Sequence, residues 1–265
     1  MLRDTTFEHG DLPRAAELLA DGLDEAERHG NQAAGRWLRG ERSFELYHGG
    51  DWDRALAALD EVLGTASEPW WFDPALLCVR AHVNVARGEG EAAVADAERA
   101  LAQGREARDP QVLYPAIAIS AFVFDRLGDS ARAAAHADEV LALWQERPKR
   151  NPRSSWLVEL GCVLLSLGRA DELAAALRHV PTLTMWGEAT LALVSGAPQE
   201  ASEHFVRIGS RPSEALARMF AGEALVTEGR RSEADAQLRA AAAFWRSVGA
   251  KRYLSDTEAL LAAAS

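Results

Sequence analysis

The sequence predicts an all-α protein built from antiparallel helical hairpins that repeat along the chain. Alanine, leucine, arginine and glutamate dominate the 265 residues, whereas segments rich in valine, isoleucine and threonine are scarce, a balance that favours helices over strands. Glycines also recur at intervals of 28 to 40 residues, each followed five residues later by alanine or leucine. A period of this length is typical of arrays in which each repeat is one helical hairpin.

Three packing positions are shared by the repeats. The glycines expected at the hairpin turns are Gly10, Gly50, Gly88, Gly128, Gly168, Gly196 and Gly229. Five residues after them come Ala15, Ala55, Ala93, Ala133, Leu173, Ala201 and Ala234. Seven residues before each glycine, from the second onward, the residue is small: Ser43, Ala81, Ala121, Gly161, Ala189 or Gly222. Nine residues after the glycines come Leu19, Leu59, Ala97, Ala137, Leu177, Phe205 and Leu238. Small residues that face each other let two helices lie close together, so a bulky substitution at Ala121 or Ala133 should cost about 1–3 kcal/mol.

The elements follow from these turns. Residues 1–30 are expected to form an incomplete first repeat, with a remnant of a first helix at 7–9 and a full helix over 11–29. Six hairpins over 31–248 should pair 31–48 with 51–66, 72–87 with 91–106, 110–127 with 130–146, 154–167 with 170–179, 183–195 with 198–208, and 212–228 with 231–247. A capping helix is expected within 249–265, over 252–263, with Ser255 or Asp256 as its cap. A repeat that begins halfway suggests a chain cut from a longer protein; a shortened native capping helix is the alternative.

The turn chemistry is clearest around Gly128. Apolar residues at helical spacing run up to this glycine, which can take the left-handed conformation that ends a helix. Asp129 or Ser130 can then cap the next helix with its side chain. We therefore expect one unbroken repeat domain over residues 1–265, with about six and a half hairpins.

Composition limits the partners and the compartment. The net charge of −11 argues against nucleic acid as a direct partner, because phosphate binding needs a basic face. No apolar run has the length of a membrane span, and the N-terminus lacks the apolar core of a signal peptide. Cys78 and Cys162 stand apart from any metal-like cluster, and they are expected to be unpaired and buried. These features predict a cytoplasmic chain with no membrane partner.

The turn glycine, the alanine five residues later, the apolar residue nine later and the small residue seven earlier together resemble the tetratricopeptide repeat (TPR). The early units are about 40 residues long rather than the usual 34. In this respect, and in the ending Ala243–Leu261, the chain is similar to TPR-like arrays of actinobacterial signalling ATPases, nucleotide cyclases and large transcription regulators. The resemblance implies a right-handed α-α superhelix that serves as a sensor or docking arm, with catalysis or DNA binding in other domains.

Motifs of catalysis are absent from the sequence. It has no phosphate-binding glycine loop, no nucleophile elbow and no His-Glu-x-x-His pair. The seven histidines fall in different helices or turns, so their spacing does not indicate a metal site. We therefore predict a protein that is not an enzyme and that needs no cofactor or metal.

First helices line the concave face of TPR arrays, so the resemblance implies where a partner would bind. Positions six, three and two before each turn glycine select the inward residues, with Trp186 added one turn earlier. The expected binding residues are Phe44, Tyr47, His48, His82, Phe122, Asp125, Arg126, Trp186, Thr190 and Glu223. The alternative interpretation is that the aromatic residues among them pack between repeats.

This mixture of aromatic and polar groups suits a protein or peptide partner, including other domains of the same parent protein. It lacks the repeated basic residues that hold terminal carboxylates in chaperone-binding TPR proteins. The alternative is a small-molecule receptor with a sugar, nucleotide or metabolite inside the superhelix. The sequence leaves open whether the chain forms a homo-oligomer.

Overall fold

A computed structural model describes Phe7 and residues 10–64, 70–146 and 154–264. Across these residues the fold contains fourteen helices and no strand, which confirms the all-α prediction. None of the described helices combines the length and the apolar character that crossing a membrane requires. Most of the predicted helical remnant at 7–9, the end of the helix predicted over 51–66 and the link at 147–153 lie outside the described residues.

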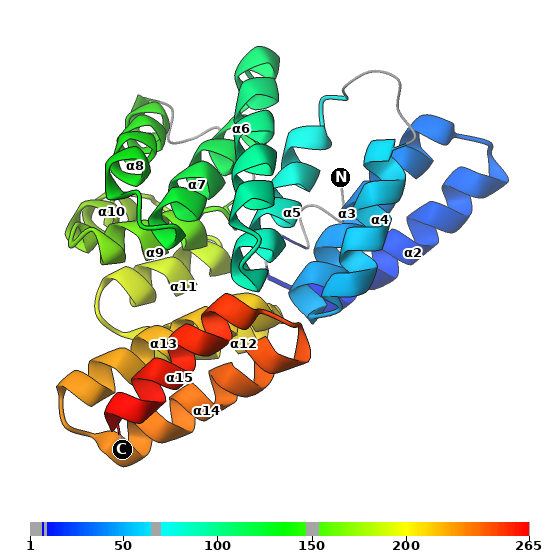
Figure 1. Cartoon of the computed structure of the whole chain (residues 1–265). Coiled ribbons are helices and arrows are strands. Elements are labelled where there is room, and N and C mark those ends of the chain that lie inside the picture. The colour runs from blue at the N-terminus through cyan, green and yellow to red at the C-terminus, as the bar shows by residue number, and fades with distance from the viewer. Residues whose placement is uncertain (1–6, 8–9, 65–69, 147–153, 265) are drawn as a thin grey trace.

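The helices follow the predicted order, and their ends agree with it within three residues wherever both are described (Figure 1). α2 (Leu12–Arg28) precedes the hairpins, and α15 (Lys251–Ala264) follows them. The six hairpins are α3 (Gln32–Gly49) with α4 (Trp52–Gly64), α5 (Asp73–Arg87) with α6 (Gly90–Ala107), α7 (Pro110–Arg126) with α8 (Ser130–Glu146), α9 (Leu157–Ser166) with α10 (Ala170–Arg178), α11 (Met185–Val194) with α12 (Pro198–Ile208), and α13 (Arg211–Thr227) with α14 (Arg231–Ser247).

The predicted cap of the last helix is wrong. α15 begins at Lys251, so Ser255 and Asp256 lie inside the helix rather than at its start. Only Ala250 separates the helix from Gly249, whose φ of 69° turns the chain at the end of α14. The turn at Gly249 therefore ends α14 and also sets the start of α15, so the helix has already begun when the chain reaches Ser255.

The turns form as their glycines predict. All seven turn glycines have positive φ, between 69° and 89°. At Gly128 the N–H of Asp129 donates to the carbonyl of Phe124 at 2.9 Å, the bond that closes a left-handed helix end. The Asp129 carboxylate then accepts from the N–H of Arg132 at 3.0 Å. Asp129 rather than Ser130 is therefore the cap of α8.

The small-residue positions lie where helices approach most closely. The residues five and nine positions after the glycines are all buried, as are those seven before. A Cβ added at Gly222 would lie 2.4 Å from Cγ of Leu238, on the partner helix of the same hairpin. A Cβ at Gly161 would lie 3.1 Å from Cγ2 of Thr190 on the next hairpin. Small residues thus allow close packing both within hairpins and between them.

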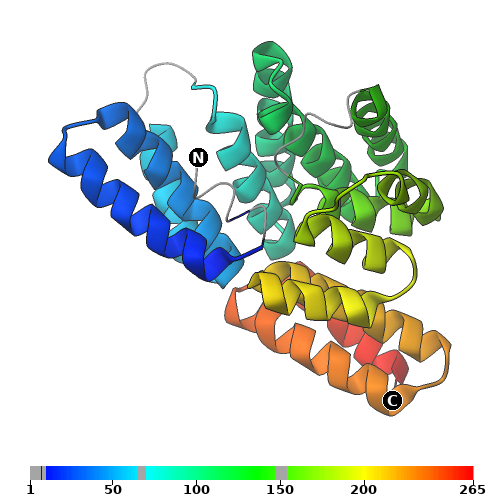
Figure 2. The same ribbon diagram turned by 180° about the vertical axis from the view of Figure 1, so that it is seen from behind.

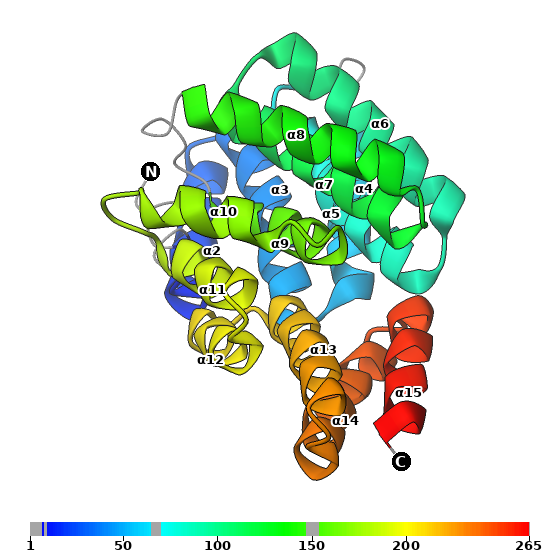
Figure 3. The same cartoon turned by 90° about the vertical axis from the view of Figure 1, so that its left-hand side faces the viewer.

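The stack curves until its ends meet. Successive hairpins wind round as an α-α superhelix, and α13 and α15 return to pack against α3 and α5 (Figures 1 and 3). Trp52 of α4 packs against Phe244 and Trp245 of α14, at ring-centroid distances of 6.0 and 6.3 Å. Arg87 of α5 donates to the carbonyl of Val248 at 3.1 Å. The superhelix is therefore closed by direct contact between hairpins far apart in sequence.

The N-terminal end of α2 joins the same closure (Figure 2). The indole N–H of Trp186, on α11, donates to the carbonyl of Phe7 at 3.1 Å, and the two rings stack 5.6 Å apart. Gly10 lies so close to α12 that an added Cβ would be 2.9 Å from Cγ1 of Ile208. The concave side of the array is therefore an interior rather than an open groove.

Candidate functional site

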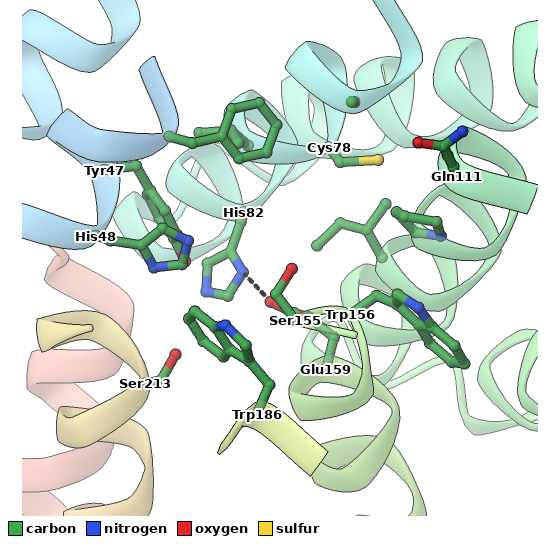
Figure 4. A pocket seen from close by; sticks show the side chains of 15 residues that line it. Tyr47, His48, Cys78, His82, Gln111, Ser155, Trp156, Glu159, Trp186 and Ser213 are labelled. Atoms are coloured by element: carbon green, nitrogen blue, oxygen red, sulfur yellow. Dashed lines mark ion pairs between the residues drawn. The ribbon is translucent and has the colours of Figure 1, made fainter. Parts of the chain in front are cut away.

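A small pocket lies at the centre of this closed superhelix, where the first helices of all six hairpins converge. Its volume is about 70 Å³. It is lined by residues of α3, α5, α7, α11 and α13, and by the turn and first helical turn of α9 (Figure 4). Its lining residues are Phe44, Tyr47, His48, Ala75, Cys78, Val79, His82, Gln111, Pro115, Ile119, Ser155, Trp156, Glu159, Trp186 and Ser213. We call this the interior pocket.

Aromatic rings form much of its wall. Tyr47 and Trp186 are almost fully buried, whereas Phe44 is partly exposed. Tyr47 lies edge-on to His82 at 5.4 Å, and burial raises the pKa of the Tyr47 hydroxyl well above its ordinary value. The hydroxyl therefore stays protonated across the physiological range. Trp156 closes the wall on the α9 side, as Figure 4 shows.

Among the described residues that line the pocket, Glu159 is the one carboxylate, and none is a lysine or an arginine. Its Oε1 lies 3.5 Å from Nδ1 of His82, the contact that Figure 4 marks with a dashed line. His82 is 3% exposed, whereas the Glu159 side chain is 20% exposed and so reaches the open side of the pocket. Nε2 of His82 is buried without a hydrogen-bond partner in the described part of the chain.

A second polar chain links the pocket to the closure of the superhelix. Ser210 donates its hydroxyl proton to Oγ of Ser213 at 2.8 Å. Nδ1 of His48 lies 2.9 Å from the same Ser210 hydroxyl. This hydrogen bond fixes the orientation of the His48 ring.

The two cysteines are unpaired and buried, as predicted. Burial raises the pKa of Cys162 to about 12 and also raises that of Cys78, so both thiols stay protonated at neutral pH. A protonated, buried thiol is neither a nucleophile nor a metal ligand. In the described residues, no group of three or more His, Cys, Asp or Glu side chains has the arrangement to hold a metal ion.

Five of the ten predicted binding residues line the interior pocket, and five do not. The structure brings together Phe44, Tyr47, His48, His82 and Trp186. Whether they bind a ligand remains a prediction.

The other five occupy different places. Phe122 is fully buried behind His82, whose ring stacks on it at 4.8 Å. Thr190 is buried and donates its hydroxyl proton to the carbonyl of Trp186 at 2.9 Å. For Phe122 this burial agrees with the alternative interpretation, in which the aromatic residues pack between repeats. Asp125 and Arg126 form an ion pair of 2.6 Å outside the pocket, and Glu223 is exposed on α13.

The position of Arg126 has a structural explanation. Its guanidinium also donates to the hydroxyl of Ser166 at 2.8 Å, and its backbone carbonyl accepts from Arg252 of α15. Arg126 therefore connects α7, α9 and the closing helix. The inward spacing expected of an open array places this residue on the concave face, but in the closed fold α15 packs there.

The pocket residues missed from the sequence share a simple spacing. Nine residues before the glycines at 88, 128 and 168 come Val79, Ile119 and Glu159, and thirteen before them come Ala75, Pro115 and Ser155. These positions continue the predicted inward face of each first helix by further turns. The pocket thus runs obliquely across the first helices, from the C-terminal end of α3 to the N-terminal ends of the later ones.

Comparison with protein-family models and with curated proteins gives no match. The chain is similar to a solved structure described as the TPR2AB-domain:pHSP90 complex of yeast Sti1, with 16% identity over 88% of this chain and 99% of that chain. The TM-score is 0.38, so the two share no more than a loose likeness in the arrangement of helices. The repeat organisation of this chain follows from its own hairpins and packing positions.

Proposed function

We propose that this chain is a non-enzymatic interaction module, a single repeat domain over residues 1–265, that recognises a protein or peptide partner through the interior pocket. The observation that carries the proposal is the convergence of six first helices, from six successive hairpins, on one pocket. Only a continuous run of hairpins can build such a site. In this proposal the chain is the sensor or docking arm of a larger bacterial signalling protein or transcription regulator.

The chemistry of the pocket supports binding rather than catalysis. The pair of Glu159 and His82 resembles the carboxylate and imidazole of a general base. Nε2 of His82, however, has no hydroxyl or thiol within hydrogen-bond distance among the described residues. The buried thiols are held protonated. No side chain of the described residues is therefore placed as a nucleophile for the pair, and its role in this proposal is to shape and charge the pocket.

The closed interior limits what can enter. A peptide laid along the concave face would have to displace the contacts between α13 and α3 and between α15 and α5. A pocket of about 70 Å³ is well below the roughly 300–1,000 Å³ of a site for a drug-sized ligand. The partner therefore presents one small group, with the rest of its contacts on the surface around the mouth. The partly exposed lining residues, among them Phe44, Gln111 and Glu159, mark that mouth.

The second candidate is a receptor for a free small molecule, which the same small volume favours. Both candidates use the interior pocket, and they differ in whether affinity depends on a polypeptide around the bound group. Selection of peptides from a random library against the full chain, alongside a thermal-shift screen of small metabolites, separates them, because a ligand that binds only the folded state raises the melting temperature.

Variants connect the binding to the pocket. Phe44→Ala, at the mouth, should weaken a selected ligand by tenfold or more. Val206→Ala removes an apolar side chain that is 52% exposed and lies outside the pocket, so it should leave affinity unchanged. Ligands that bind both variants equally well would place recognition elsewhere and contradict the proposal.

A further inference from the structure

Resting on the proposed function, we infer that the interior pocket binds a primary alkylammonium group, held by the Glu159 carboxylate among the rings of Tyr47, Trp156 and Trp186. These four side chains come from α3, the start of α9 and α11, and the pocket brings them together (Figure 4). No sequence motif marks this arrangement, because its members lie in three different hairpins.

Charge is the first reason. Of the described residues in the lining, Glu159 is the one formally charged side chain, and its ion-pair partner in the described part of the chain is His82 alone. Two other carboxylates with little exposure have an arginine: Asp96 lies 2.7 Å from a guanidinium nitrogen of Arg80, and Asp125 is 2.6 Å from Arg126. A carboxylate without such a partner favours a cationic ligand, since an opposite charge offsets its desolvation.

His82 is the one described side chain that pairs with this carboxylate. Its Nδ1 lies 3.5 Å from Oε1 of Glu159, and its Nε2 has no hydrogen-bond partner among the described residues. The negative charge of Glu159 is also felt through the interior, because it helps to raise the pKa values of Tyr47 and Cys78.

The rings supply the second contact. A cation over the face of an aromatic ring is attracted by its quadrupole, and tryptophan is the strongest partner. Trp156 and Trp186 line the pocket together with Tyr47 and are 3%, 1% and 6% exposed. Rings that are already buried and packed lose little freedom when a ligand binds. Aromatic walls around one carboxylate therefore recognise both the charge of an ammonium group and the methylene groups attached to it.

Size distinguishes among cations. An apolar cavity of roughly 150 Å³ takes a benzene molecule, which has six heavy atoms. By that measure the interior pocket, at about 70 Å³, holds roughly three heavy atoms. An ammonium nitrogen with two methylene carbons fits this space. A trimethylammonium head or a guanidinium with its attached carbon has more atoms than the pocket holds.

Two sources can supply this group. A protein partner can insert the tip of a lysine side chain, whose Nζ, Cε and Cδ atoms are the three that fit. A free small amine can bind in the same way. The shared chemistry is the primary alkylammonium, and the net charge of −11 favours the approach of either cation.

The test uses the full chain and NMR of the tryptophan indole N–H groups. Trp156 and Trp186 report on the pocket, and Trp71, which is 43% exposed and lies outside the lining, is the reference. The probes are ethylammonium chloride, ethanol as a neutral molecule with the same number of heavy atoms, sodium acetate and tetramethylammonium chloride, all at equal ionic strength. A second arm uses a short peptide with one central lysine, compared with the same peptide carrying acetyl-lysine.

We expect ethylammonium to shift the indole N–H signals of Trp156 and Trp186 in a saturable way, with a dissociation constant of about 1 mM or weaker. The other three probes should give no saturable response. Glu159→Gln should lower the affinity for ethylammonium at least tenfold. The matched control is Glu223→Gln, which makes the same change of charge at an exposed position outside the pocket and should have no effect. Tighter binding of the lysine peptide than of ethylammonium would identify a protein source, and equal or weaker binding a free amine.

Three results would overturn the inference: no saturable shift with ethylammonium, a response to ethanol or acetate as strong as that to ethylammonium, or unchanged ethylammonium affinity in a folded Glu159→Gln chain. The preference among probes is measured on the unchanged chain, so it stands even if Glu159→Gln fails to fold. If the pocket binds acetate or ethanol as strongly as ethylammonium, the ammonium inference is wrong, but the proposed function still stands. The proposed function itself would be contradicted if the selected ligands bound the Phe44→Ala variant with unchanged affinity.

Discussion

Nδ1 of His48 lies 2.9 Å from Oγ of Ser210, although the two residues are 162 positions apart in the chain. The bond joins the end of α3, in the first complete hairpin, to the turn before α13, in the last. His48 also lines the interior pocket. One buried hydrogen bond therefore connects the closure of the superhelix with the wall of its candidate binding site.

Ser210→Ala should destabilise the fold by about 1–3 kcal/mol, because it removes a buried hydroxyl that bonds both His48 and Ser213. Urea unfolding followed by circular dichroism measures this. Ser232→Ala, at an exposed position of α14, is the control and should change the free energy of unfolding by less than about 0.5 kcal/mol. Equal effects of the two variants would mean that the closure contributes nothing through this bond.

Gly222→Ala tests the close packing within a hairpin. Helix propensity alone would make alanine more stable by about 1 kcal/mol. The new Cβ would however lie 2.4 Å from Cγ of Leu238, and overpacking of this kind typically costs about 1–3 kcal/mol. We expect a net loss of stability in urea unfolding. Gly49→Ala, at the end of α3 with nothing within 4 Å of the added carbon, should be neutral or stabilising.

Two phenylalanines on the predicted concave face should behave differently. Phe122 is fully buried, so Phe122→Ala should lower the free energy of unfolding by about 3–5 kcal/mol. Phe44 is partly exposed at the mouth of the pocket. Phe44→Ala should therefore lower the free energy of unfolding less than Phe122→Ala does, and it should lower the affinity for the ligand more. Thermal melts and affinities measured on both variants check this; a larger loss of melting temperature for Phe44→Ala would contradict the assignment.

Alkaline pH should destabilise the folded protein through its buried thiols and its buried tyrosine. Burial raises the pKa of Cys162 to about 12 and also raises those of Cys78 and Tyr253. The folded state then keeps protons that the unfolded chain releases, so the stability from these groups is complete below the unfolded pKa, about 8.5 for a thiol. It is lost as pH rises towards the folded values. Urea midpoints between pH 7 and 10 should fall, and Cys162→Ala should make the fall less steep.

The same burial predicts thiol chemistry. At pH 8 a disulfide reagent such as DTNB should react with neither cysteine of the folded chain, and with both after denaturation in guanidinium. Rapid reaction of either thiol in the folded state would show that the interior opens readily around α5 or α9.

Local sequence signals predicted the helices and turns well, because each signal acts within a few residues. Gly128 needs only its own freedom to take φ of 87°, and Asp129 needs only the neighbouring N–H of Arg132. The packing positions were predictable for the same reason, since Ala121 and Ala133 are both fully buried and lie on two helices joined by one turn. α15 was the exception, because its start follows from Gly249 rather than from a polar cap.

The candidate site was only half predictable, because it depends on how far each hairpin rotates relative to the last. A single inward spacing found Tyr47 and His82 but missed Glu159, which lies on the same helical face one turn earlier than the predicted position. It also placed Arg126 on an open face that α15 covers. The rotation is a sum of many small packing contacts, and no short stretch of sequence encodes that sum.

The closure also sets the number of repeats. In an open solenoid each repeat contacts only its neighbours, so repeats can be added or removed and stability changes roughly in proportion. In this chain Trp52 of α4 contacts Trp245 of α14, so the rotations between successive hairpins must together bring the last hairpin back to the first. Deleting or inserting one hairpin would separate these two surfaces. The repeat count is therefore a structural constant of this fold, and its unfolding should be cooperative across the whole ring.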